Sequence, residues 1–488
     1  MAKIRRALLV SIDNLRSDCV GRYPSSRISK IAAVPRRPPT PTLDHLADSG
    51  CFFPHCFVSA PYTTASHASM LTGCFPIGHG VREYYRTPIA TDVLTLFSRF
   101  KRAGYTTILA TDFPALLGPI LGFTRDVDHY IVTDDDEVRR LLGELAGPVF
   151  CFWHFGSVHN PFGLTSPAID GYHFERSVVE VADLAGVARP DVLGPEWMEA
   201  DRPVEERMLR QWYFRATERL YEEDRYGDLM SLYTQGISYF DSTRLARVVE
   251  CMDALRARGD MLAVVTADHG EEYSRRAYAH FNGLWEGIVE VPLFVIAPEI
   301  PADHTVHDLA RSVDIAPTML ELAGIGEPKP DSQFRAMDGV SLAQTLRRGL
   351  PHGHVAIGES LFGMTEVIRD HLTNCFDRGQ LLPSETMANR HLLYVRDARW
   401  KLIVERDLSS GSELGHLFDL KADVGEEIDV IASYPAAATN LRRHIDRYLD
   451  LEPRRADSAA VGNTEHIARA LVDMGYFRAR HPEEHDHA

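Results

Sequence analysis

The stretch Ala7–Asn14, with the sequence ALLVSIDN, joins a short apolar run directly to an aspartate and an asparagine. Basic residues precede the run, but it is too short for a signal peptide and no small-residue cleavage site follows. We therefore predict a buried first strand over Ala7–Ile12. A carboxylate at the end of such a strand is held rigidly and suits a hard metal ion, although Asp13 could instead cap the following turn.

Further apolar runs of similar length follow, and helical patterns lie between them. The predicted strands are Thr106–Ala110, Val149–Phe155, Met261–Thr266 and Val291–Ala297, and the predicted helices are Asp92–Ala103, Asp241–Arg258 and Val313–Ala323. Strands that alternate with helices form doubly wound parallel sheets, so we expect all of these strands to be parallel. The predicted fold class is α/β, with a central, mostly parallel sheet flanked by helices.

A second polar motif, Asp268-His269-Gly270, follows the predicted strand Met261–Thr266. Ligand sites in doubly wound sheets lie beyond the carboxyl ends of the strands, which is also where Asp13 lies. The motif supplies an oxygen and an imidazole side by side. It could also be an ordinary turn with incidental polar residues, but two acidic strand ends in one sheet can converge on one cation.

A third motif, Pro61–Gly73, places several hydroxyls before a helix-like segment. The N-terminus of a helix favours an anion, and a hydroxyl such as that of Thr63 becomes a nucleophile if a metal lowers its pKa. The alternative is an ordinary N-cap, because threonine and serine are common before helices.

The composition limits the classes of partner. The 488 residues carry a formal net charge of −17, which argues against a nucleic-acid or anionic-membrane surface, since both need a basic face. The seven cysteines show no regular spacing, which favours a reduced, cytoplasmic setting. No apolar stretch is long enough to span a bilayer. We expect no membrane partner, and a chain that could form a homo-oligomer.

We divide the chain into a catalytic α/β domain at 1–340, a C-terminal α+β subdomain at 341–452 and a polar tail at 453–488. Within the first, residues 163–228 are rich in acidic, arginine and aromatic residues and predict a helical insertion or lid. It could cover a substrate or form a subunit interface. Strands are predicted at Tyr394–Glu405 and His416–Leu420 in a smaller antiparallel sheet.

Taken in order, the motifs resemble those of the alkaline phosphatase/sulfatase superfamily, and its sulfatase-like branch most closely. The matching segments are Asp13–Asp18, Thr63–Gly73, Gly78–Val81, Asp268–Glu271, His280–Leu293, Arg399, Lys401–Ile403 and Leu417–Glu426. Ala65 replaces a proline of the family pattern, and Phe281 and Trp285 are further departures. The resemblance runs to about residue 435 and implies an alkaline phosphatase-like fold.

The resemblance implies that Asp13, Asp268 and His269 bind a divalent metal ion, with Thr63 as a further ligand. The Thr63 oxygen would attack phosphorus or sulfur in line and form a covalent intermediate, which water or an acceptor then resolves. His67 stands where true sulfatases have arginine and would orient Thr63. His159 and His280 would contact the transferred group or the leaving group, although either could be a satisfied loop histidine.

Two departures narrow the expected chemistry. Sulfatases carry a cysteine or serine at the position of Thr63, matured to formylglycine, whose hydrate can expel sulfate. Threonine cannot undergo that conversion and is typical of phospho-directed relatives, such as phosphodiesterases and phosphonate-ester hydrolases. Asn14 stands where many sulfatases have a second aspartate, and it offers a carbonyl oxygen without charge.

The ligand set suits Mn²⁺, Zn²⁺ or Mg²⁺ better than a carboxylate-rich Ca²⁺ cage. One ion is expected, and a second would need further ligands, which His159 and His280 could supply. The resemblance implies a small anionic ester as substrate. We expect a metal-dependent hydrolase of phosphate mono- or diesters. The alternatives are a soluble transferase that moves a phosphoryl-linked group to an acceptor, and a sulfatase-fold binding protein without catalysis.

Overall fold

Strand β1 (Arg6–Ile12) lies inside the main sheet, whose strand order in the described part of the chain is β10-β2-β9-β6-β1-β5-β3-β4, with β11 also paired to β2. The other strands are β2 (Cys51–Phe57), β3 (Thr106–Thr111), β4 (His129–Val132), β5 (Val149–Phe155), β6 (Met261–Thr266), β9 (Glu290–Ile296), β10 (His304–Thr305) and β11 (Ala310–Arg311). The computed structural model describes residues 4–24, 37–82, 87–160, 162, 177–190, 204–280, 283–326, 333–351, 353–361 and 390–451.

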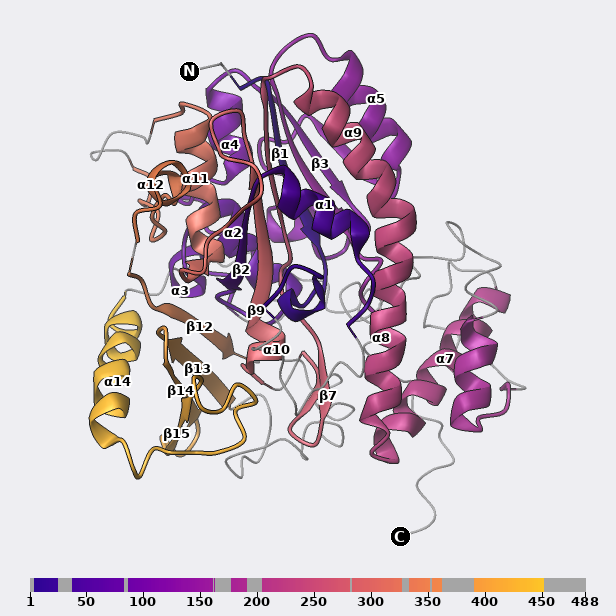
Figure 1. Ribbon diagram of the computed structural model, residues 1–488, viewed down its shortest axis with the longest axis vertical. Helices are drawn as coiled ribbons and strands as arrows, with labels where there is room; N and C mark the ends of the chain where they lie inside the picture. The colour runs from indigo at the N-terminus through magenta and orange to yellow at the C-terminus, as the bar shows by residue number, and fades with distance from the viewer. Residues whose placement is uncertain are drawn as a thin grey trace.

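Helices cover both faces of this sheet (Figure 1), so every residue of β1 is buried. One layer contains α2, α4 and α11, and the other contains α1, α5 and α9. The helices are α1 (Pro41–Ser49), α2 (Thr63–Thr72), α3 (Pro76–His79), α4 (Leu96–Arg102), α5 (Asp135–Glu144), α9 (Ala246–Arg256), α10 (Glu286–Val289), α11 (Ile315–Leu322) and α12 (Ala343–Arg348). The predicted α/β class with a mostly parallel central sheet is confirmed.

The direction predicted for Val291–Ala297 is wrong. Strand β9 runs antiparallel to both of its neighbours, β6 and β2. The chain leaves β6 at Thr266 and makes only the short hairpin of β7 (Glu272–Ser274) and β8 (Ala277–Ala279) and the single turn of α10 before β9 begins. A strand parallel to β6 would have to start at the opposite end of the sheet, at the level where β6 itself begins. The chain would need a crossover to return there, and this connection contains none.

Strands β2 and β4 were not predicted. In β2 the pairing with β9 is irregular between Phe53 and Cys56, and Pro54 lies in that irregular part, where a proline removes no ladder hydrogen bond. The predicted helix at Asp92–Ala103 begins later, as α4, because the Thr95 side chain accepts a hydrogen bond from the Ser98 backbone N–H and caps it there. Local capping therefore set this boundary.

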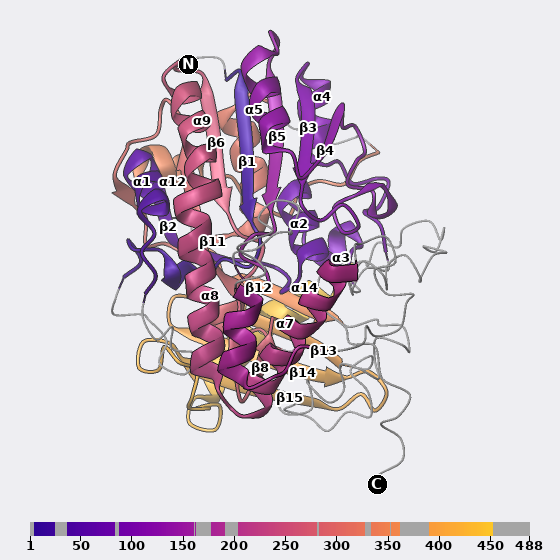
Figure 2. The same ribbon diagram turned by 90° about the vertical axis from the view of Figure 1, so that its right-hand side faces the viewer.

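The described part of the predicted insertion is helical. Helix α7 (Val204–Glu222) and helix α8 (Tyr226–Phe240) form a long hairpin, and α8 continues through a π-helical turn at Asp241–Leu245 into α9. Figure 2 shows α8 and α9 as one continuous rod along the sheet. Residues 163–176 and 191–203 of the insertion, and the predicted tail 453–488, lie outside the described residues. Among the described helices, none has the length and apolar character needed to cross a membrane.

A second, antiparallel sheet has the order β12-β13-β14-β15. Its strands are β12 (Ala356–Leu361), β13 (Arg390–Arg396), β14 (Trp400–Asp407) and β15 (Glu413–Asp419), and helix α14 (Pro435–Leu449) packs against it (Figure 1). The small antiparallel sheet predicted from Tyr394–Glu405 and His416–Leu420 is therefore present, with the first of these segments divided between two strands.

Strand β12 lies directly against the segment that leads to Thr63. The Glu359 backbone N–H donates to the Ser59 carbonyl at 3.0 Å, and the Tyr394 hydroxyl donates to the Val58 carbonyl at 2.6 Å. Gly358 is required here, because a Cβ at this position would lie 2.7 Å from the Ser59 oxygen. The second sheet therefore supports the backbone just before helix α2.

Glu359 gives this contact a pH dependence. Its carboxylate is fully buried, and although burial raises its pKa, hydrogen bonds from Arg82 and His391 outweigh burial and lower the pKa to about 2. Since the folded-state pKa lies below that of the unfolded chain, the stabilisation is complete above the ordinary value of 4.5 and is lost as the pH falls toward 2.

We expect the Glu359→Gln variant to lose about 3 kcal/mol of unfolding free energy at neutral pH, and the difference from wild type to shrink below pH 4.5. Urea unfolding of both proteins between pH 7 and pH 3 measures this difference. A gap that stays constant over the whole range would show that ionisation of Glu359 is not the source of the difference.

Candidate active site

The two acidic strand ends predicted from the sequence meet. Strands β1 and β6 are parallel neighbours with Ser11 opposite Thr266, so the residues that follow them emerge side by side. Asp13, Asp268 and His269 each offer a ligand atom, and these atoms all lie within 4.8 Å of one another. All three side chains are fully buried. This geometry can hold one metal ion.

Unpaired polar atoms test whether these residues fit a cation. Among the described residues, the buried atoms Asp13 Oδ1, Asp268 Oδ2 and His269 Nε2 have no hydrogen-bond partner. The His269 nitrogen lies 3.8 Å from Asp13 Oδ1 and 3.5 Å from Asp268 Oδ2. Buried polar atoms are normally paired, so three unpaired oxygen and nitrogen atoms this close together could hold a divalent ion. The residues fit the metal.

Asn14 offers a fourth candidate ligand atom, an amide oxygen. It has a left-handed backbone, with φ of 68°, which asparagine tolerates better than most residues. Its backbone N–H donates to Asp268 Oδ1 at 3.1 Å and its amide Nδ2 donates to Glu271 Oε2 at 2.8 Å. Its buried Oδ1 has no partner within the described chain. Glu271 thus fixes the amide with its nitrogen occupied and its oxygen available to a cation.

The charges of Asp13, Asp268 and His269 also favour a bound cation. Burial raises the pKa of Asp13 to about 7 and that of Asp268 to about 6, and for Asp268 the nearby Asp13 carboxylate adds to the effect. Burial lowers the pKa of His269 to about 3, so its ring is neutral, the form that binds metals. Two buried carboxylates beside a neutral imidazole are costly, and a divalent cation would offset that cost.

Thr63 is the first residue of helix α2. Tyr62 occupies the N-cap position without a side-chain capping bond, and the Thr63 hydroxyl donates to Asp13 Oδ2 at 3.4 Å. The capping alternative for Thr63 is therefore wrong. Its oxygen is fully buried beside a candidate metal ligand, at a helix end whose free N–H groups favour an anion.

His67 lies one turn further along α2 and contacts Thr63 through the backbone. Its Nδ1 lies 2.7 Å from the Thr63 carbonyl, which can only accept, so Nδ1 carries the proton. Its Nε2 therefore accepts from the Ser11 hydroxyl at 2.8 Å. Burial lowers the pKa of His67 to about 3. With both nitrogens occupied, His67 can orient Thr63 but is not placed to take the proton of its hydroxyl.

His280 and His159 lie on the His269 side of the cluster. The His280 ring stacks on that of His269 with 4.0 Å between centroids, and its Nδ1 lies 3.3 Å from Glu271 Oε1. The His159 ring lies 5.5 Å from that of His280, and its Nδ1 donates to the Asn160 carbonyl at 2.9 Å. Both histidines are buried. His79 is bonded to Ser69 and to the Val81 N–H, which is a structural arrangement.

Sequence reasoning gave no role to Glu271, His154 or Tyr233. Glu271 is part of the matched motif, and its position directly after the glycine was the available signal. The Tyr233 hydroxyl on α8 donates to the Asn14 carbonyl at 2.7 Å and accepts from the Arg16 N–H at 2.9 Å. Nothing near Tyr233 in the sequence indicates this contact. His154 hydrogen-bonds to Asp13, as described below.

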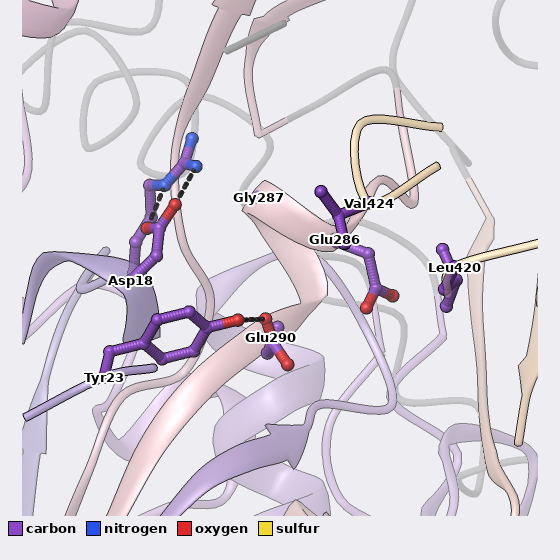
Figure 3. Close-up of a pocket in the computed structure, with 8 residues that line it drawn as sticks. Asp18, Tyr23, Glu286, Gly287, Glu290, Leu420 and Val424 are labelled. Atoms are coloured by element: carbon purple, nitrogen blue, oxygen red, sulfur yellow. Dashed lines mark hydrogen bonds and ion pairs between the residues drawn. The ribbon is translucent and has the colours of Figure 1, made fainter. Parts of the chain in front are cut away.

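Figure 3 shows a small cavity, whose lining includes Asp18, Glu286 and Glu290. Its volume of about 20 Å³ holds about one water molecule. Its lining carboxylates are already paired: Asp18 with Arg16, Glu290 with Tyr23 and Glu286 with Lys401. Arg16 also donates to the Glu271 carbonyl at 2.9 Å, so this side chain of the cavity wall supports the backbone of the Asp268–Glu271 motif. We assign no substrate to the cavity.

The sequence that forms this site matches a known protein family. The family model described as Sulfatase matches residues 6–325, which include all the residues of the cluster. The chain belongs to the sulfatase family. The family and its solved members place the chain in the alkaline phosphatase-like superfamily, as the motif resemblance predicted, and they support a hydrolase.

The similar proteins act on more than one kind of ester. Delta 4,5-hexuronate-2-O-sulfatase of Bacteroides thetaiotaomicron is 24% identical over 369 residues, 70% of this chain and 71% of the relative. Arylsulfatase K of Xenopus laevis is 21% identical over 508 residues, 97% of this chain and 89% of the relative. The solved phosphonate monoester hydrolase of Agrobacterium radiobacter has a TM-score of 0.62 and 19% identity, covering 92% of this chain and 96% of that one. A solved 2-O GAG sulfatase has a TM-score of 0.57 and 18% identity, covering 98% and 95%. These structural likenesses show the fold.

Proposed function

We propose that this sulfatase-family hydrolase cleaves phosphate or phosphonate esters, with Thr63 as its nucleophile. The observation that carries the proposal is the Thr63 hydroxyl, buried at the start of α2 and 3.4 Å from the Asp13 carboxylate, whose other oxygen is unpaired among the described residues. Threonine favours phosphorus over sulfur, because it cannot be converted to formylglycine and so cannot release sulfate through an aldehyde hydrate.

Asp13, Asp268 and His269 would hold the metal ion, with Asn14 as a further ligand and Thr63 close by. The bound ion would supply positive charge for the oxygens of the transferred group and favour ionisation of a nearby hydroxyl. The mixed oxygen and nitrogen donors favour Mn²⁺, Zn²⁺ or Mg²⁺. His67 holds the Thr63 backbone through its carbonyl, so the hydroxyl points at the cluster.

In the first step the Thr63 oxygen forms a bond to phosphorus, its proton passes to Asp13 Oδ2, to which the hydroxyl donates, and the bond from phosphorus to the leaving-group oxygen breaks. His159 or His280 would give the leaving oxygen its proton, since the His280 ring stacks on His269 and the His159 ring contacts that of His280. In the second step water gives a proton back to that histidine and attacks phosphorus, and the Thr63 oxygen leaves and takes its proton back from Asp13. An acceptor hydroxyl in place of water would make the same site a transferase.

Sulfate-ester hydrolysis is the second candidate, and the sequence relatives favour it, because those quoted above are sulfatases. Nitrophenyl esters separate the two. We expect purified protein with Mn²⁺ or Zn²⁺ to hydrolyse bis(nitrophenyl) phosphate, nitrophenyl phosphate or a nitrophenyl phosphonate faster than nitrophenyl sulfate, compared as kcat/KM. A preference for the sulfate ester would overturn the phosphorus assignment and leave the family intact.

A further inference from the structure

His154 is a residue of the main sheet that contacts Asp13. It is near the carboxyl end of β5, opposite Ser11 in the parallel pairing with β1, and is buried. Its Nε2 lies 3.2 Å from Asp13 Oδ2, and its Nδ1 lies 3.1 Å from the Thr111 hydroxyl at the end of β3.

The Asp13 carboxylate determines where the His154 proton lies. A carboxylate can only accept, so Nε2 carries the proton and donates to Asp13 Oδ2. Nδ1 of the neutral ring is then an acceptor, and the Thr111 hydroxyl donates to it. The Thr111 oxygen in turn accepts a hydrogen bond from the Phe113 backbone N–H at 2.9 Å.

Asp13 Oδ2 therefore receives two hydrogen bonds, one from His154 and one from Thr63 at 3.4 Å. Asp13 Oδ1 is the oxygen without a partner among the described residues, and it is the one that lies 3.8 Å from His269 Nε2. The two oxygens of Asp13 thus differ: Oδ1 is available to a cation, and Oδ2 accepts hydrogen bonds. Of the two hydrogen bonds to Oδ2, only the one from His154 is independent of Thr63.

We propose that His154 is a positioning residue that holds Asp13 with Oδ1 toward the cation and Oδ2 toward Thr63. The inference rests on the metal centre of the proposed function. Outer hydrogen bonds of this kind fix the orientation of ligating side chains. The bond from His154 also persists when Thr63 gives up its proton, so the carboxylate keeps its orientation through the reaction.

The surroundings hold His154 in turn. The Gly156 backbone N–H donates to Asp112 Oδ2 at 2.8 Å, and Arg244 of the π-helical turn binds both Asp112 oxygens, at 2.5 and 3.0 Å. The Phe113 ring lies 5.3 Å from the His154 ring. The strand end that carries His154 is therefore fixed on both sides, as a positioning role requires.

The experiment titrates metal-free protein with Mn²⁺ alone and with Zn²⁺ alone in a calorimeter, and so needs no substrate. His154→Phe keeps the ring volume but loses the donor, and we expect its Kd to rise about 10- to 100-fold. His154→Gln can place an amide N–H near the same point and should restore much of the affinity. Thr111→Val leaves the histidine but frees its Nδ1, and should weaken binding less. His55→Phe, a buried histidine paired with Glu290 elsewhere, is the matched control and should keep the wild-type Kd.

Two outcomes would overturn the inference alone: a wild-type Kd in folded His154→Phe, or a His154→Gln protein as weak as the phenylalanine variant. If His154→Phe does not fold, His154→Gln and Thr111→Val decide, and wild-type affinity in Thr111→Val with weak binding in His154→Gln would overturn it. A wild-type protein that binds neither ion overturns the metal centre and this inference with it.

Discussion

Thr63→Ala should lose hydrolysis of the preferred nitrophenyl ester by on the order of 10³-fold or more in kcat, because in the proposed mechanism the Thr63 oxygen forms the covalent intermediate. Thr63 is buried at the start of α2 with its hydroxyl on Asp13, so alanine removes the reacting oxygen and changes little else. The measurement is kcat with saturating metal, together with intact-mass detection of a phosphorylated wild-type intermediate during turnover.

Thr64→Ala is the matched control. Thr64 is equally buried on the same helical turn, and its hydroxyl has no partner among the described residues, so its loss should leave kcat unchanged. Full activity in Thr63→Ala would mean that water or another side chain attacks directly, and the nucleophile assignment would fail. Equal losses in both variants would point to a disturbed helix start and not to chemistry.

Removal of the metal should have the second large effect. A ligand at 100 times its Kd raises the free energy of unfolding by about 2.7 kcal/mol, so Mn²⁺ or Zn²⁺ should raise the Tm of chelator-treated protein and restore its activity. Asp13→Asn and Asp268→Asn should lose both responses, because each removes a charge from the cluster of ligand atoms. Thermal unfolding with and without metal measures this directly.

The metal-free variants give a sharper test. Burial raises the pKa of both Asp13 and Asp268, so without metal these carboxylates cost stability, and asparagine at either site should leave the metal-free Tm equal to or above that of wild type. The exposed Asp253, which pairs with His45, supplies the control Asp253→Asn, which should keep the metal response. A metal response retained in Asp13→Asn would remove Asp13 from the ligand set.

The sequence predicted those site residues that are marked by a local pattern. Asp13 and Asp268 each lie at the end of an apolar run. Because ligand sites lie beyond the carboxyl ends of parallel strands, the two aspartates could be predicted to lie close together. The direction of β9 was missed because direction depends on the connection, and Val291–Ala297 has the same apolar pattern in either sense. A pattern of side chains reports burial, not strand polarity.

The supporting residues around the site were missed for a related reason. Tyr233 and Asn14 are 219 positions apart, and His154 and Asp13 are 141 apart, so no spacing in the chain links them. Each is a typical buried residue of its helix or strand until the fold places a polar partner opposite it. His67 was expected to orient Thr63, but its bond to the Thr63 carbonyl depends on the proton position, which residue type alone does not fix.

The contact of β12 with the segment before Thr63 bears on how such an enzyme can diversify. Gly358 leaves no room for a side chain against Ser59, and Tyr394 and Glu359 bond to the same short segment. The smaller sheet is thus part of the scaffold that holds Thr63 and is not an exchangeable module. New substrates would more readily arise by changing loops around the site than by recombining whole C-terminal halves between relatives, since a graft would have to preserve this close backbone fit.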